Sequence, residues 1–222
     1  METKTAFQEH LKKIEEDVRD MGEKVTNAIS RASDALKSRD LSLAHQIIAD
    51  DVRINEQRFS IEEECIGLIA SEYPAVKDIQ VIVSILSIIT ELERIGDYGE
   101  GIAKIVIMIG NEEPLKPLVD IPRMAEITLE MIQKGLQAFI HRDVDLAMTV
   151  VSLDSVVDSI YDQVFRELLT FMLVDTKTTN RATRLIWVAH NLERAADRAT
   201  NICERVVYMI TGDKGEIGAS KY

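Results

Sequence analysis

The chain has 222 residues, is 46% hydrophobic and 29% charged, and carries a formal net charge of −12 at pH 7. So large an excess of negative charge argues against non-specific binding to nucleic acid or anionic lipid, and leaves room for cation binding or a basic partner. With four prolines, ten glycines and 5% aromatic residues, the composition is typical of a helical protein and not of a turn-rich β-sandwich.

No segment of the sequence predicts export or membrane insertion. The first residues, METKTAFQEHLKKIEED, lack the apolar core of a secretory signal. The longest strongly apolar run, Val81–Ile89, is shorter than the roughly 20 residues that span a bilayer. We therefore expect a cytoplasmic protein that meets a membrane only through its partners. Cys65 and Cys203 lie far apart without CxxC spacing, so we expect two small buried residues and no zinc site or disulfide.

Apolar periodicity predicts three helices in the first half. An apolar stripe with alternating steps of four and three residues suits antiparallel bundle packing in the first helix. Asp40 can cap the second helix, and Pro74 fits the first turn of a third that continues to about Gly110, a length of roughly 50 Å. The core positions of the first two helices are Phe7, Leu11, Ile14, Val18, Met21, Val25, Ala32 and Leu36, then Leu43, Ile47, Ile54, Ile61 and Leu68.

The same pattern restarts after Asn111–Pro117, a segment with two prolines that is the best linker candidate in the chain. Asp143 can open a fifth helix, and a sixth is expected from Thr176–Asn180 to Gly212, a good C-terminal cap. Core positions of the fourth and fifth helices are Ile127, Met131, Leu136 and Phe139, then Leu146, Val150, Val157, Val164 and Phe171.

The second half repeats the first. A shift of 103 residues places Arg39–Asp40 on Arg142–Asp143, and a shift of 100 places Leu92–Asp97 (LERIGD) on Leu192–Asp197 (LERAAD). The difference of three residues falls in the connection before the third helix of each half, where loops absorb length changes. We expect an all-α fold of two antiparallel three-helix bundles related by a pseudo-twofold axis, with domains at residues 1–111 and 117–212 and a flexible tail at 213–222.

Acidic residues recur four positions apart at matching places in both halves. On a helix this spacing stacks two carboxylates on one face, which costs a few tenths of a kcal/mol unless a cation offsets the repulsion. Clustered carboxylates suit Mg²⁺, Mn²⁺, Ca²⁺ or iron. If the second and third helices of each bundle pack antiparallel, the candidate metal ligands form two sets, Asp51, Asn55, Glu93 and Asp97, and Asp154, Asp158, Glu193 and Asp197. Glu100 could add a ligand to the first set, but its counterpart is Thr200.

Two simpler interpretations of these residues stay open. The pairs can be solvated helix faces of an acidic protein. Alternatively, Arg94, Arg194 and Arg198 can neutralise the same carboxylates by ion pairing along the helix, without a metal.

Other kinds of site are less well supported. A ferritin-like di-iron centre requires a Glu-x-x-His motif, and none of the four histidines follows a glutamate by three residues. Glycine-rich phosphate loops, GxSxG elbows and HExxH motifs are absent from the sequence. We therefore expect a protein that is not an enzyme.

Taken together, these residues resemble the PhoU family of phosphate transport accessory proteins and phosphate-signalling regulators. The resemblance rests on LERIGD and LERAAD, on Asn201–Cys203, on Asp51-x-x-x-Asn55 with Asp154-x-x-x-Asp158, and on Pro74, Ala75 and Asp78. It covers nearly the whole chain, from about Phe7 to Gly212.

The resemblance implies a negative regulator of the phosphate-starvation response, often dimeric. It implies an adaptor between the ATPase subunit of the phosphate ABC transporter and a sensor histidine kinase. It also implies multinuclear metal clusters bound through the repeated acidic motifs, so we expect a divalent metal or an iron cluster at the eight ligand candidates.

The first half departs from this pattern at two positions. Asn55 stands where the second half has Asp158, and Gly101 stands where it has Asn201. The loss of one negative charge predicts that the second site binds a cation more strongly. Competing hypotheses are a metal-binding or metal-storage bundle without a signalling role and a purely structural helical repeat.

Overall fold

The structure is a computed structural model that describes residues 2–72 and 74–213. Within these ranges the chain forms six long helices, as predicted, so the all-α fold class is confirmed. The expected flexible tail lies outside the described residues, apart from Asp213. The helices are α1 (Glu2–Ser38), α2 (Leu41–Glu72), α3 (Val76–Ile109), α4 (Asp120–His141), α5 (Val144–Val174) and α6 (Thr179–Thr211), with a short 3₁₀ helix, η1 (Thr176–Thr178), before α6.

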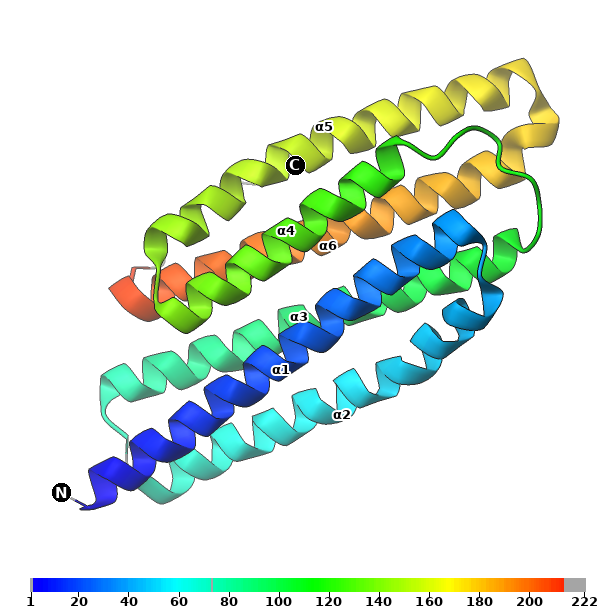
Figure 1. Cartoon of the computed structure of the whole chain (residues 1–222). Helices are drawn as coiled ribbons and strands as arrows, with labels where there is room; N and C mark the ends of the chain where they lie inside the picture. The colour runs from blue at the N-terminus through cyan, green and yellow to red at the C-terminus, as the bar shows by residue number, and fades with distance from the viewer. Residues whose placement is uncertain (1, 73, 214–222) are drawn as a thin grey trace.

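The six helices form two three-helix bundles that pack against each other. Helices α1, α2 and α3 pack together, as do α4, α5 and α6, and the two bundles meet through α3 with α6 and through α1 with α4. Figure 1 shows α1 and α4 in front of α3 and α6, with α2 and α5 along the two outer edges. The helices α2 and α5 thus each leave one side without a neighbouring described helix.

Most positions of the predicted stripes form the core, but Phe171 is only partly buried and lies outside it. In α1, Val18, Met21 and Val25 are fully buried at steps of three and four residues. Helix α3 contacts α1, α2 and α6, so it is buried over a broad arc that includes Ile85, Ile88 and Leu92. The two cysteines are buried on helices and free, as expected.

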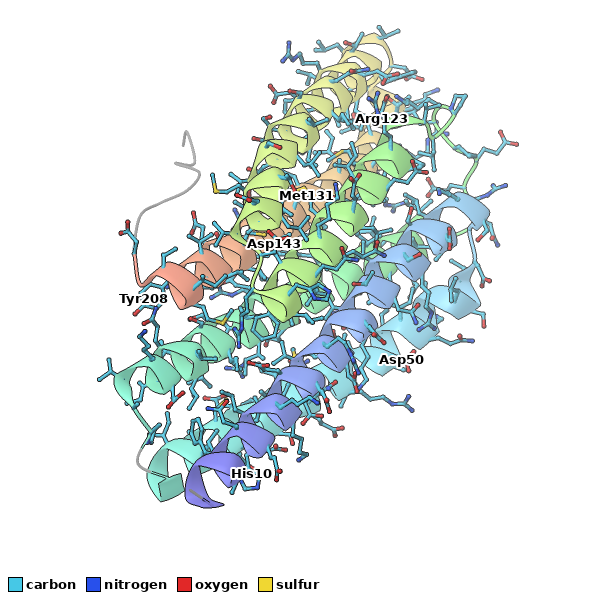
Figure 2. The ribbon with its side chains drawn as sticks, turned by 60° about the vertical axis from the view of Figure 1, so that its left-hand side comes forward. His10, Asp50, Arg123, Met131, Asp143 and Tyr208 are labelled. Atoms are coloured by element: carbon cyan, nitrogen blue, oxygen red, sulfur yellow. The ribbon has the colours of Figure 1, made fainter. Side chains whose placement is uncertain are left out.

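The first turn of each bundle repeats in detail. Arg39 and Arg142 both adopt left-handed backbone conformations, with φ of 56° and 54°. The following aspartates then cap the next helix: Asp40 Oδ1 accepts from Leu43 N and Asp143 Oδ1 accepts from Leu146 N, each at 2.9 Å. Figure 2 labels Asp143 at the start of α5. These matching turns are direct structural evidence of the duplication.

One local prediction is wrong. Pro74 does not lie in the first turn of α3, because the helix begins at Val76 and Ala75 is its N-terminal cap residue. Asp78 supplies the start signal instead, since its Oδ2 accepts a hydrogen bond from Ala75 N at 3.3 Å.

No helix in the described part of the chain is long and apolar enough to cross a membrane.

Candidate functional site

The first acidic site lies where α2 packs against α3. Asp51 and Asn55 are one turn apart on α2, and Glu93 and Asp97 are one turn apart on α3. Burial, followed by the neighbouring charges of Asp97, Glu100 and Glu93, raises the pKa of Asp51 to about 6. The pKa values of Glu93 and Asp97 are also raised, in both cases chiefly by burial. The predicted antiparallel packing therefore brings these acidic groups within electrostatic range of one another.

The second acidic site, between α5 and α6, is more strongly coupled. Burial and the charges of Asp158 and Asp197 raise the pKa of Asp154 to about 6. Burial, Asp197, Asp158 and Asp154 raise the pKa of Glu193 to about 7, against the opposing effect of Arg194. Burial also raises the pKa values of Asp158 and Asp197. Repulsion among four carboxylates is thus partly relieved by retained protons, and a bound cation would relieve it as well.

Two buried carboxylate oxygens of the second site lack a hydrogen-bond partner, Oδ1 of Asp154 and Oε2 of Glu193. The Asp154 carboxyl is not wholly without a partner, because a side-chain hydrogen bond with Thr200 lowers its pKa. The nearest cationic candidate, Nδ1 of His190, is 3.5 Å from Glu193 Oε2 and pairs with it only when protonated. Burial and Arg194 lower the pKa of His190, so that pair is weak near neutral pH. A buried oxygen without a partner costs free energy of folding, and oxygens of this kind are the ligands that hard cations prefer.

The two sites differ in how their charge is satisfied. Asn55 Nδ2 donates to Asp51 Oδ2 at 2.9 Å, whereas Asp158 at the matching position can donate nothing when ionised. Arg58 lowers the pKa of Glu93, while its counterpart Tyr161 is neutral and packs against His190 with 6.1 Å between ring centroids.

A cavity of about 180 Å³ also adjoins the first site. Its lining includes Asp51 and Asp50 together with Lys24, Arg31 and Arg53, and both arginines pair with Asp50. With Asn55 in place of a fourth carboxylate, the first set of ligand candidates carries one acidic group fewer than the second.

Ion pairing with arginine accounts for part of the acidic pattern. Arg194 Nη1 lies 3.1 Å from Asp197 Oδ2, as the ion-pairing interpretation predicts. Arg94 and Arg198 instead pair with Glu91, at 3.1 and 3.2 Å. Glu100 pairs with Lys104 at 2.6 Å, so it is engaged as a helical ion pair. Most of the candidate ligands therefore remain without an arginine partner.

Sequence reasoning missed the role of Glu91 at the interface between the bundles. Glu91 of α3 accepts from Arg198 and from Asn201 of α6, each at 3.2 Å. At the pseudo-symmetric place, a Cβ on Gly101 would lie 2.8 Å from Oδ1 of Asn191. The side chain of Asn191 thus occupies the space that a Cβ at position 101 would take. The signal was present in the sequence, since a shift of 100 residues pairs Glu91 with Asn191 and Gly101 with Asn201.

The eight candidate ligands form two sets, yet they do not form a preassembled metal cage. Among the described residues, no group of three or more histidine, cysteine, aspartate and glutamate side chains is arranged to hold an ion. Asp97 is exposed, whereas the other seven candidates are partly buried. The donor chemistry and the unpartnered oxygens of the second site fit a hard cation, and its side chains would have to converge to bind one.

The fold and the paired sites define a class of protein: duplicated three-helix bundles with an acidic site on each repeat. The family model described as PhoU domain matches residues 18–106 and 121–206, one match in each bundle. The chain belongs to the PhoU family.

The chain is similar to relatives and to solved structures over nearly its full length. The Phosphate-specific transport system accessory protein PhoU homolog of Aquifex aeolicus is 38% identical, covering 91% of this chain and 92% of that protein. The Phosphate-specific transport system accessory protein PhoU of Escherichia coli K12 is 31% identical, covering 93% of this chain and 86% of that protein. The crystal structure of PhoU from Pseudomonas aeruginosa superposes with a TM-score of 0.90 at 34% identity, covering 93% of this chain and all of that one. The structure from Streptococcus pneumoniae gives 0.88 at 31% identity, over 94% of this chain and 99% of that one.

Proposed function

We propose that this protein is a cytoplasmic, non-enzymatic regulator of phosphate uptake and phosphate-starvation signalling. In this proposal it acts as an adaptor between the ATPase subunit of a phosphate ABC transporter and a sensor histidine kinase, and it forms a homodimer. Membership of the PhoU family supports the link to phosphate transport, because relatives are named accessory proteins of the phosphate-specific transport system.

The acidic sites are the surfaces that we assign to this function. The observation that carries the assignment is the pair of unpartnered buried oxygens, Asp154 Oδ1 and Glu193 Oε2. A protein that keeps uncompensated carboxylates at a surface site has a use for them with a cation or a basic partner group. The more tightly bound ion would be held by Asp154, Asp158, Glu193 and Asp197. The more weakly bound ion would be held by Asp51, Asn55, Glu93 and Asp97. A bound metal would neutralise the site and fix the orientation of its carboxylates for a partner.

Metal storage without signalling is the second candidate. Storage requires an enclosed volume for many ions, whereas these sites lie at the outer helix pairs with a few ligands each. The geometry therefore favours regulation by a few bound ions.

Elemental analysis of protein purified without chelator tests the metal part of the proposal. Wild type should carry metal, and the double variant Glu193→Ala/Asp197→Ala should lose the share held by the second site. The matched control is Glu126→Ala/Glu130→Ala, an acidic pair with the same spacing on exposed positions of α4. Unchanged, sub-stoichiometric metal in all three proteins would contradict the ligand assignment.

Binding assays with the purified ATPase subunit and the cytoplasmic part of the kinase test the adaptor role. Substitution of Asp154, Asp158, Glu193 and Asp197 by alanine should weaken binding at least tenfold, and the α4 control should not. Full binding by the quadruple variant would show that partners dock elsewhere.

A further inference from the structure

Helix α2 exposes a row of large apolar side chains at intervals of seven residues. Val52, Phe59 and Ile66 each leave 57% of their surface exposed. Seven residues make almost two helical turns, so the three side chains lie along one side of the helix. Helix α2 packs only against α1 and α3 among the described elements, so no described helix covers this row. Single exposed apolar residues are ordinary, but three at regular spacing along one helix face indicate an interaction surface.

More apolar side chains are exposed at the end of the bundle where α2 connects to α3. There α2 adds one exposed apolar side chain and the start of α3 adds three more. We define the α2 surface as Val52, Phe59, Ile66 and Ile69 of α2 with Val76, Ile79 and Val83 of α3.

The fold itself does not require the α2 surface. Under the shift of 103 residues, Val52, Phe59 and Ile66 correspond to Ser155, Asp162 and Leu169 of α5. The second bundle folds in the same way with polar residues at two of these three positions. Helix α5 also exposes apolar residues along its length, but at intervals of eight, nine and four residues instead of seven: Met148, Val156, Phe165, Leu169 and Leu173. The heptad spacing is therefore specific to the first repeat.

The charges beside the row indicate what can bind it. Glu56 and Glu63 follow Val52 and Phe59 by one turn and are exposed, and no ion pair within the described residues involves either carboxylate. A second copy of this surface would bring these glutamates against like charges, which disfavours self-association through it. A helix with basic flanks would meet them with opposite charges.

We propose that the α2 surface binds an amphipathic helix of another protein, with apolar side chains at heptad spacing flanked by lysine or arginine. Helix-in-groove recognition of this kind uses apolar anchors for affinity and flanking charges for orientation. This site goes beyond the adaptor role argued above, because it needs neither a metal nor the carboxylates of either acidic site.

Two synthetic helical peptides serve as probes of the full-length protein. The basic peptide carries leucine at the two core positions of each heptad and lysine at the flanking positions, and the acidic peptide replaces each lysine with glutamate. Fluorescence anisotropy of labelled peptide measures the affinity. We expect the basic peptide to bind at least tenfold more tightly than the acidic one.

The variants Phe59→Glu and Ile66→Glu should each weaken binding of the basic peptide at least tenfold. Attraction that depends on charge alone would instead strengthen, because both substitutions add negative charge. The matched control is Leu169→Glu on α5, the counterpart of Ile66, which should bind within twofold of wild type. Circular dichroism confirms that each variant is folded, and Phe59→Ser replaces any variant that is not.

Three results would overturn the proposal. Equal binding of both peptides would remove the requirement for basic flanks. If Leu169→Glu weakens peptide binding as much as the α2 variants do, the peptide does not bind specifically at the α2 surface. Undiminished binding to both α2 variants would lead to the same conclusion. Sedimentation that shows a wild-type dimer abolished by Phe59→Glu would assign the surface to a second copy of this chain.

Discussion

Asn55 donates a hydrogen bond through Nδ2 to Oδ2 of Asp51 at 2.9 Å, in the place where the second repeat has the carboxylate of Asp158 beside Asp154. One amide thus replaces one negative charge and supplies a donor to the remaining one. Asp154 thus lacks the amide donor that Asp51 receives, although a side-chain hydrogen bond with Thr200 lowers its pKa. The two repeats therefore contain versions of one site that differ by one charge and one donor.

Exchange of these two residues should exchange the cation affinities of the sites. Asn55→Asp adds a charge to the first site and removes the donor to Asp51, so we expect its Mn²⁺ affinity to rise at least several-fold. Asp158→Asn should lower the affinity of the second site to a similar degree. Isothermal titration of chelator-stripped protein with Mn²⁺ measures both effects. An Asn55→Asp variant that binds Mn²⁺ no better than wild type would refute the proposed cause of the asymmetry.

The raised carboxyl pKa values predict how stability depends on pH. Glu193 titrates near 7 in the folded protein and near 4.5 when unperturbed, so between these values the folded state holds more protons than the unfolded state. The free energy of unfolding of metal-free protein should therefore fall as pH rises from about 4.5 to about 7. The loss is on the order of 1 kcal/mol per carboxyl, because the sites are only half-buried and solvent screens them.

Thermal melts in chelator across this pH range measure the effect, and Glu193→Gln isolates it from the general repulsion of a chain with net charge −12. The variant should show a shallower fall in melting temperature than wild type, whereas Glu130→Gln should match wild type. Identical pH profiles for wild type and Glu193→Gln would contradict the assignment.

Much of the fold was predictable because its signals are local and occur twice. Apolar steps of three and four residues predicted the six helices, and the caps at Asp40 and Asp143 predicted where α2 and α5 begin. Antiparallel packing of the second and third helices in each bundle was an assumption, and it was enough to group Asp51 with Glu93 and Asp154 with Glu193; the structure has both helix pairs in contact.

What the sequence could not supply depends on contacts between helices far apart in the chain. Spacing on α6 allows Arg198 to pair with nearby acids of its own helix, yet it pairs with Glu91 of α3 because the two bundles meet there. The position of Pro74 depended on one or two residues at a helix end, where periodicity carries little information. The exposure of Phe59 also required the structure, because an apolar residue on a helix is ordinarily assigned to the core.

The pair of Glu91 and Arg198 should contribute to the stability of the interface between the bundles. Each side chain is only 15% exposed, and Glu91 also accepts from Asn201. Glu91→Ala should lower the free energy of unfolding by about 1–3 kcal/mol, because it leaves a partly buried guanidinium without its carboxylate. Urea unfolding measures the loss, and a double-mutant cycle with Arg198→Ala isolates the interaction.

The comparison variant for this prediction is Glu130→Ala, which breaks the more exposed helical pair of Glu130 with Lys134. That change should cost at most about 0.5 kcal/mol. If both alanine variants lose the same stability, the pair between the bundles has no special role.

Two glycines in helix interiors should respond in opposite directions to alanine. A Cβ on Gly22 of α1 would lie 2.5 Å from both Cδ atoms of Leu136, a buried residue of α4 at the contact between the bundles. Gly22→Ala should therefore destabilise the protein by about 1–3 kcal/mol through overpacking. Beyond the adjacent backbone of its own helix, a Cβ on Gly67 of α2 would meet no atom of the described residues within 4 Å. Gly67→Ala should stabilise by about 0.5–1 kcal/mol, because alanine has the higher helix propensity. Urea unfolding of both variants measures the two changes in the free energy of unfolding. Equal changes would mean that α1 and α4 can separate at Leu136 without cost. The two bundles would then be joined mainly through α3 and α6.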